Sequence, residues 1–340
     1  SKIWYEKLPS PYLMYLRVLH EYFCIDTTKY ISTPHNITNG KFLDLKYQED
    51  AIRLSLATIE KHNGVIISDV VGLGKSIIGS AVANNLGLRT IVIAPPHLIP
   101  QWEDYRTEFA FNARVFSRGK IETAFKHFHD LTQIDEKWLI IIDEAHAYRN
   151  EFTKDYAMLH ELCEGNYVIL LTATPFSNAP TDIYSMIKLF QIPTKSTLQT
   201  VDNLGKVFRD LIGRYKKLKK SQKDQKLDDR AIEEEIKQIS DKIRGIISPL
   251  VIRRSRIDLD KITSYKKDLE NQNIKFPIVR SPQPLEYDLG ALSELYLKTL
   301  QMLSTENSTH DEDIDDVLTG ESFKAARYKP IRYVKHECIE

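Results

Sequence analysis

Residues 64–76 read GVIISDVVGLGKS and place a short β-branched run directly before a loop that contains two glycines. The run 65–68 predicts a buried strand, and residues 77–86 behind the loop predict a helix. A strand, a glycine-bearing loop and a helix in this order bind phosphate, because backbone N–H groups at the helix N-terminus converge on phosphate oxygens. The expected nucleotide-binding residues of this loop are Asp69, Gly72, Leu73, Gly74, Lys75 and Ser76.

Short β-branched runs alternate with longer helical stretches on the C-terminal side of this loop as far as Thr174. Further strands are expected at 90–94, 139–142 and 167–172, and a weaker one at 113–116. This alternation predicts an α/β fold, a parallel sheet with helices on both faces. Because ligands of such sheets bind at the carboxyl ends of the strands, the residues that follow each strand are the functional candidates.

An acidic motif, Asp143-Glu144-Ala145-His146, follows the apolar strand expected at 139–142. Carboxylate oxygens are ligands that Mg²⁺ prefers, and a second carboxylate can position and deprotonate an attacking water. We assign the metal to Asp143 and the Ser76 hydroxyl, and the water to Glu144. Asp143 as a simple N-cap of a helix is the alternative that involves no metal.

The phosphate loop departs from the general pattern in one place, because Asp69 stands where that pattern has glycine. A chance Gly-x-Gly-Lys-Ser sequence at a helix start is therefore the structural alternative. The acidic motif weighs against it, since a lysine loop and paired carboxylates are complementary parts of one magnesium nucleotide site.

The composition is that of a globular protein, with 42% apolar and 28% charged residues in a chain of 340. Lys plus Arg and Asp plus Glu number 47 each, so a phosphate-binding surface must be a local patch. Cys24, Cys163 and Cys338 lack zinc-site spacing, which favours a reducing compartment. No apolar run reaches the roughly 18 residues of a membrane span, and we expect a cytoplasmic protein without a membrane partner.

Apolar residues take up helical spacing beyond Pro193. One stripe runs from Val201 to Leu218 and a second from Ile232 to Ile246, which predicts an antiparallel helical hairpin projecting from the α/β lobe. Lysines gather at its tip, where they either contact a phosphate backbone or form a solvated face. They are Lys216, Lys217, Lys219, Lys220, Lys223 and Lys226.

The phosphate loop and the acidic motif together resemble superfamily 2 helicases, and among them the Swi/Snf-like ATPases, including the bacterial branch that often carries a phospholipase D-like domain. Asp69 is typical of that group. Tyr47-Gln48 resembles the Q motif that reads adenine. The resemblance implies the N-terminal RecA-like lobe of a P-loop ATPase that uses ATP and Mg²⁺. The residues it makes catalytic are Lys75, Asp143, Glu144 and His146.

Further motifs in family order resemble the nucleic-acid track. They are motif Ia at 93–98 with Trp102, motif III at 171–175 with Asn178, and a basic block at 251–256. Residues 117–119 resemble motif Ib, although an ordinary turn explains them equally well. The implied partner is duplex DNA, and the implied contact or coupling residues are His97, Trp102, Ser117, Arg118, Gly119, Thr172, Thr174, Asn178, Arg253 and Arg254.

The resemblance also implies what these residues lack. The residue after His146 is Ala147, where the family usually has a basic side chain. Nothing after residue 300 resembles motif VI, which supplies arginines to the γ-phosphate. We therefore expect a fragment whose second RecA-like lobe lies outside this sequence. The expected parts are 1–40, an N-terminal helical segment; 41–200, the ATP-binding lobe; 201–280, a helical protrusion with the basic block; and 281–340, the start of a linker or second protrusion.

The implied activity is hydrolysis of ATP to drive movement along DNA. Two alternatives remain open at this point. Another P-loop phosphotransferase would need an acceptor pocket and has no use for the motif around Thr172. A non-catalytic, nucleotide-dependent interaction module would not need Glu144.

Overall fold

The computed structural model describes residues 30–133, 136–175, 179–198, 201, 203–223 and 229–276. The chain divides into two compact units, Ser1–Lys275 and Phe276–Glu340, and the described helices and strands lie in the first. The predicted N-terminal segment 1–40 lies mostly outside the described residues, and 281–340 lies wholly outside them. The helices are α2 (Pro34–Ile37), α3 (Lys46–His62), α4 (Lys75–Leu86), α5 (Ile99–Glu108), α6 (Ile121–Leu131), α7 (Lys154–Cys163), α8 (Pro180–Lys188), α9 (Leu204–Lys223), α10 (Asp229–Ile247), α11 (Arg256–Lys261) and α12 (Thr263–Asn271).

Six parallel strands form one sheet in the order β3-β2-β4-β5-β1-β6. The predicted α/β fold is confirmed, and each of the five expected strands is present within one residue of its predicted ends. The strands are β1 (Gly64–Ile67), β2 (Thr90–Ala94), β3 (Ala113–Ser117), β4 (Leu139–Asp143), β5 (Tyr167–Leu171) and β6 (Val251–Ile252).

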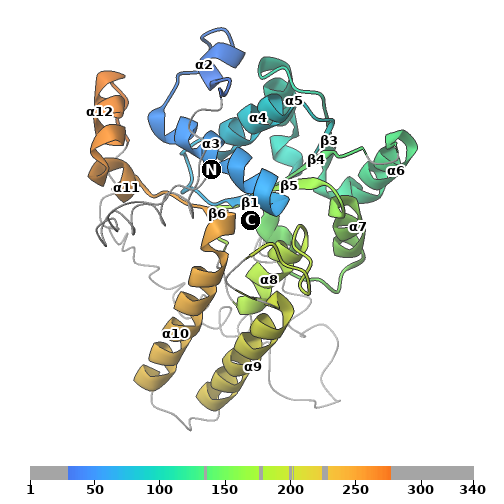
Figure 1. Cartoon of the computed structure of the whole chain (residues 1–340), viewed down its shortest axis with the longest axis vertical. Helices are drawn as coiled ribbons and strands as arrows, with labels where there is room; N and C mark the ends of the chain where they lie inside the picture. Colours follow the sequence, from blue (N-terminus) through green and yellow to red (C-terminus); the bar gives the residue numbers. More distant parts are fainter. Residues whose placement is uncertain are drawn as a thin grey trace, which may run out of the picture. The chain divides into compact units, whose positions relative to one another are not determined.

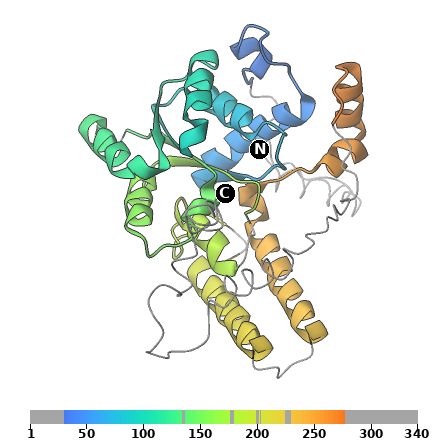
Figure 2. The same ribbon diagram turned by 180° about the vertical axis from the view of Figure 1, so that it is seen from behind.

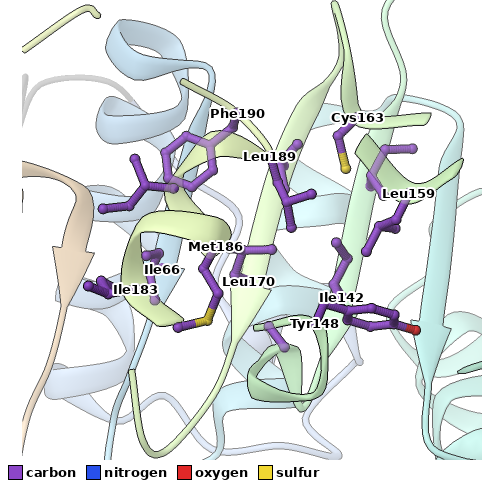
Figure 3. Close-up of a cluster of buried hydrophobic side chains, with 14 of the residues drawn as sticks. Ile66, Ile142, Tyr148, Leu159, Cys163, Leu170, Ile183, Met186, Leu189 and Phe190 are labelled. Carbon is purple, nitrogen blue, oxygen red and sulfur yellow. The ribbon is translucent and has the colours of Figure 1, made fainter. Parts of the chain in front are cut away.

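Both faces of the sheet are buried under helices (Figure 1). Successive strand residues point to opposite faces, so Ile66 and Leu170 pack toward α7 and α8, whereas Ile67 and Leu171 pack toward α4. Figure 3 shows the first of these clusters, with Met186 of α8 lying among the strand side chains. Continuous apolar strands such as β4 are the sequence signature of this double burial, because neither side of the strand meets water.

The short strand β6 is a finding that the sequence did not predict. It pairs with β1 at the edge of the sheet, with Ile252 opposite Ile67. Within the predicted protrusion 201–280, the chain returns to the sheet of the lobe after α10, and the domain bounds remain a prediction. A two-residue strand carries no readable periodicity, and only its pairing with β1 defines it.

The predicted helical hairpin is present as α9 and α10, which lie side by side and extend away from the sheet (Figures 1 and 2). Its base is anchored by Phe208 of α9, which is fully buried and stacks on Tyr184 of α8 with ring centroids 4.7 Å apart. Lys216 and Lys220 are exposed near the far end of α9, whereas Lys226 lies outside the described residues. Among the helices that the structure describes, none is long and apolar enough to cross a membrane.

His62, the last residue of α3, links stability to pH. Its ring is buried, Nδ1 lies 2.7 Å from the Thr197 hydroxyl, and burial lowers its pKa to about 4 from 6.5. The unfolded chain binds the proton more tightly than the folded chain does. The stability that the buried neutral ring contributes is therefore fully present above pH 6.5 and is lost as the pH falls toward 4. We expect acidification from pH 7.5 to 5 to remove about 2 kcal/mol through this group. Urea unfolding of wild type and His62→Gln at both pH values measures it, and equal acid losses in the two proteins would contradict the assignment.

Candidate nucleotide site at the carboxyl edge of the sheet

The strand register brings the predicted motifs to one edge of the sheet. Asp143 at the end of β4 is level with Leu171 of β5, which is level in turn with Ile67 of β1. The phosphate loop leaves β1, the acidic motif leaves β4, and Thr172 follows β5. Because all strands run in the same direction, motifs that are separated in sequence emerge together, as expected for ligand sites of such sheets.

The phosphate loop relies on glycine at two positions. Gly72 and Gly74 have φ values of +88° and +80°, in the left-handed region that side chains other than glycine rarely adopt. A Cβ atom at Gly74 would also lie 2.5 Å from Nε2 of Gln48. Helix α4 begins at Lys75 directly behind the loop, so the unpaired N–H groups of its first turn point toward the loop.

Two side chains of α3 form hydrogen bonds with the backbone of the phosphate loop. The Tyr47 hydroxyl and the Gln48 amide both donate to the carbonyl oxygen of Leu73, at 3.3 and 3.2 Å, and both side chains are buried. At the other end of the loop, the Lys75 ammonium donates to the carbonyl oxygen of Asp69 at 2.9 Å. The adenine-reading role of Gln48 remains a prediction, and its observed contact is with the phosphate loop.

Trp102 does not lie on the surface as a nucleic-acid contact would require. Its side chain is 1% exposed, and its Nε1–H donates to Oδ2 of Asp143 at 2.8 Å. The observed contact of Trp102 is with the acidic motif, and its predicted role in DNA contact or coupling remains a prediction. The N–H of Glu144 donates to the other oxygen, Oδ1, at 2.9 Å, so both oxygens of Asp143 have fixed directions. Burial raises the pKa of Asp143, and the Trp102 hydrogen bond opposes that rise.

Glu144 occupies the left-handed backbone region, with φ of 51° and ψ of 49°. Such strain in a residue other than glycine is costly and tends to persist at functional sites. Its Oε2 lies 3.1 Å from Nδ1 of His146, which lies 3.5 Å from the Thr172 hydroxyl. That hydroxyl accepts the N–H of Thr174 at 3.2 Å. One continuous set of contacts thus connects the acidic motif to Thr174, which is exposed beyond the end of β5.

Arg254 is also placed differently from its prediction as a DNA contact. The side chain is 8% exposed and forms a buried ion pair with Asp69, whose side chain is 0% exposed. Its Nη2 and Nε donate to the two carboxylate oxygens at 2.5 and 3.1 Å. The carboxylate of Asp69 therefore faces Arg254 within the lobe. The two residues are 185 positions apart, and no local sequence signal connects them.

Several predicted nucleic-acid residues are exposed at or beyond the same edge of the sheet. His97 follows β2, Arg118 and Gly119 follow β3, and Thr174 follows β5. Ser117 is half-buried at the end of β3, and Arg253 is exposed after β6. Asn178 lies outside the described residues. The exposed members form a candidate surface for a phosphate backbone, and their contact with nucleic acid remains a prediction.

The residues of the edge fit a magnesium nucleotide. The oriented Asp143 carboxylate and the half-buried Ser76 hydroxyl supply oxygen ligands, which Mg²⁺ prefers. Backbone N–H groups of a glycine loop at a helix start bind phosphate in general, and burial raises the pKa of Asp143 while the positive charge of Lys75 opposes that rise. The edge therefore combines oxygen ligands for a metal ion with a loop that suits phosphate, and phosphate transfer requires both.

The chain matches two family models, a SNF2-related domain over residues 119–278 and the res subunit of type III restriction enzymes over residues 41–177. Similar curated proteins include the Bacillus subtilis uncharacterized ATP-dependent helicase YqhH, which is 28% identical and matches 41% of this chain and 28% of its own length. The Arabidopsis thaliana CHD3-type chromatin-remodeling factor CHR7 is 24% identical over 52% of this chain and 18% of its own length.

Among solved structures, the Sulfolobus solfataricus SWI2/SNF2 ATPase core in complex with dsDNA is 22% identical, with a TM-score of 0.48. The match covers 70% of this chain and 49% of that chain. The chain thus spans less than a third of the length of the curated relatives named above.

Proposed function

We propose that this chain is the N-terminal RecA-like lobe of a Swi/Snf-like member of the superfamily 2 helicases, and that it binds Mg-ATP between the Lys75 loop and Asp143-Glu144. The protein that contains it hydrolyses ATP to ADP and phosphate and uses the energy to move along DNA. The observation that carries the proposal is the convergence of the two motifs at the ends of β1 and β4.

Binding rests on the phosphate loop. N–H groups of the loop and of the first turn of α4 donate to phosphate oxygens, and the Lys75 ammonium adds charge. Bound phosphate competes with the Asp69 carbonyl for Lys75, so we expect the lysine to exchange one acceptor for the other. Tyr47 and Gln48 support the loop through Leu73, and adenine contact by Gln48 is part of the proposal.

Hydrolysis proceeds by in-line attack of water on the γ-phosphate. Glu144 orients the water and accepts its proton, while Lys75 and the loop amides stabilise charge on the transferred group. Asp143 and Ser76 would hold Mg²⁺, which when bound neutralises negative charge on the phosphates. The Trp102 hydrogen bond fixes the direction of the Asp143 carboxylate, and supporting contacts of this kind tune metal sites.

Coupling to DNA runs from Glu144 through His146 to Thr172 and the loop that begins at Thr174. The contacts of 3.1 and 3.5 Å along this route support the proposal. The DNA, which we propose to be duplex, lies across the exposed residues that follow β2, β3 and β5. Its backbone phosphates are the groups that Arg118 and Arg253 would contact.

We further propose that residues 41–200 together with β6 form the first motor lobe, and that α9 and α10 form its protrusion. A second RecA-like lobe supplies arginines to the γ-phosphate, as the family resemblance implies. The proposal entails an intracellular, DNA-associated protein.

Lys75→Ala tests the binding half of the proposal. We expect it to weaken Mg-ATP binding by roughly tenfold or more, because a charge-assisted contact with phosphate is lost. Titration calorimetry with ATP measures the change. Lys126→Ala is the matched control, since Lys126 is exposed on α6 and pairs with Glu122 of the same helix. Equal ATP affinity of the Lys75→Ala and Lys126→Ala proteins would overturn the assignment of the loop.

A further inference from the structure

We propose that Arg254 is a positioning residue that holds both ends of the phosphate loop and connects them to the strand returning from the helical hairpin. The inference rests on the proposed function and assigns Arg254 a place within its nucleotide site. It replaces the surface role that the sequence predicted for this arginine.

Arg254 holds the first residue of the loop through several hydrogen bonds. Its Nη2 and Nε donate to the carboxylate of Asp69 at 2.5 and 3.1 Å, and its backbone N–H donates to Oδ1 at 2.8 Å. The carbonyl oxygen of Asp69, on the same residue, accepts the Lys75 ammonium at 2.9 Å. The position of Asp69 therefore sets where the catalytic lysine starts its reach toward phosphate.

Arg254 holds the far end of the loop through Tyr47. Its Nη1 donates to the Tyr47 carbonyl oxygen, and its guanidinium carbon lies 5.7 Å from the centre of the Tyr47 ring. The Tyr47 hydroxyl donates in turn to the carbonyl oxygen of Leu73, directly before Gly74. One guanidinium thus restrains Asp69 by direct contact and Leu73 through a single intervening side chain.

The backbone around Arg254 continues the pairing between β6 and β1 into the loop. Ser68 N–H donates to the Ile252 carbonyl at 2.7 Å, and Val70 N–H donates to the Arg254 carbonyl at 3.1 Å. Strand β6 follows α10 with only the short turn Ser248–Leu250 between them. The hairpin is therefore connected to the start of the phosphate loop through the turn Ser248–Leu250 and strand β6.

Burial makes the ion pair between Arg254 and Asp69 sensitive to the loss of either partner. With side-chain exposures of 8% and 0%, neither charge of the pair is compensated by water. Removing one partner leaves the other charge buried without its counterion, which is far more costly than losing a surface ion pair. The planar fork of arginine matches a carboxylate with two parallel hydrogen bonds, which the single ammonium of lysine does not reproduce.

The test compares Arg254→Gln, Arg254→Lys, Asp69→Asn and the double variant Asp69→Asn/Arg254→Gln in the 340-residue chain. Two quantities are measured, the Mg-ATP affinity and the rate of amide hydrogen exchange of residues 69–75 without nucleotide. Leu162→Ala is the matched control, because Leu162 is fully buried in α7 on the other side of the sheet and its truncation lowers stability without touching the loop.

We expect Arg254→Gln to weaken ATP binding by roughly tenfold or more and to speed exchange in the loop, because displaced catalytic groups lose effectiveness steeply with distance. Arg254→Lys should lie between it and wild type. The double variant should bind ATP no more weakly than the worse single variant, because the pair acts as a unit. If Arg254→Gln does not fold, Arg254→Lys and Asp69→Asn provide the same comparison.

The proposal is overturned if the pair variants keep ATP affinity within about twofold of wild type and exchange their loop amides no faster than Leu162→Ala. Failure of the proposed function gives a different result, in which the wild-type chain itself does not bind Mg-ATP. Loop exchange in the nucleotide-free chain still decides on Arg254 in that case, because that measurement does not depend on ATP.

Discussion

Glu144→Gln in the full-length protein is expected to lower DNA-stimulated ATP hydrolysis by roughly 10²–10⁴-fold and to leave Mg-ATP binding intact. The amide keeps the shape of the side chain and loses its ability to accept a proton from water. Because the phosphate loop, Lys75 and Asp143 are unchanged, ground-state binding does not depend on this carboxylate. Steady-state phosphate release with DNA and calorimetric titration with ATP measure the two quantities separately.

The matched control for this prediction is Glu122→Gln, the same chemical change on the exposed face of α6. It should leave both hydrolysis and binding at the wild-type level. Unchanged hydrolysis in Glu144→Gln would exclude the assigned role of Glu144 and would favour a non-catalytic, nucleotide-dependent interaction module. A parallel loss of binding and hydrolysis would mean that Glu144 acts in holding the nucleotide.

The isolated 340-residue chain is expected to bind Mg-ATP but to hydrolyse it about 10³–10⁵-fold more slowly than the full-length protein. The family resemblance assigns the arginines that stabilise charge on the γ-phosphate to a second lobe outside these residues. Without them the transition state loses its largest positive contribution, whereas binding relies on the Lys75 loop. Single-turnover hydrolysis with and without duplex DNA gives the rate.

Lys75→Ala in the same isolated chain sets the background for this measurement, since it weakens Mg-ATP binding and removes the charge that stabilises the transferred phosphate. Rapid DNA-stimulated turnover by the isolated chain would contradict the prediction. It would require an arginine within this sequence to take the role that the family resemblance assigns to a second lobe. Arg256 is the candidate for that outcome, because its Nη2 atom lies 3.7 Å from the position of a Cβ atom at Gly72 in the phosphate loop.

The orientation of the buried side chains that hold the site could not be predicted from the sequence. Trp102 and Arg254 were both predicted as DNA contacts because they stand in motifs that resemble the nucleic-acid track. The structure buries both, one against Asp143 and the other against Asp69. A tryptophan or arginine in a motif has the same local signal whether its side chain points outward or inward, since orientation depends on which element packs against it.

Local sequence patterns were enough to predict the positions of the main strands and the motifs that follow them. The strands β1, β2, β4 and β5 are short runs of mostly apolar residues, and this pattern depends only on the burial of both strand faces. Strand β3, in which Arg114 is exposed, gives a weaker signal. The phosphate loop and the acidic motif are likewise contiguous in sequence, because their chemistry requires neighbouring atoms. The hairpin of α9 and α10 could be read from two apolar stripes for the same reason.

Only the tertiary structure decided which distant residues meet. The pairing of β6 with β1 rests on two residues with no periodicity of their own, and that pairing is what carries Arg254 to Asp69 across 185 positions. Strand order and the contacts it creates are determined by packing of the whole lobe. No sequence pattern within a single segment therefore predicts them. The sequence thus specified the phosphate loop, and the folded lobe determined what holds that loop in place.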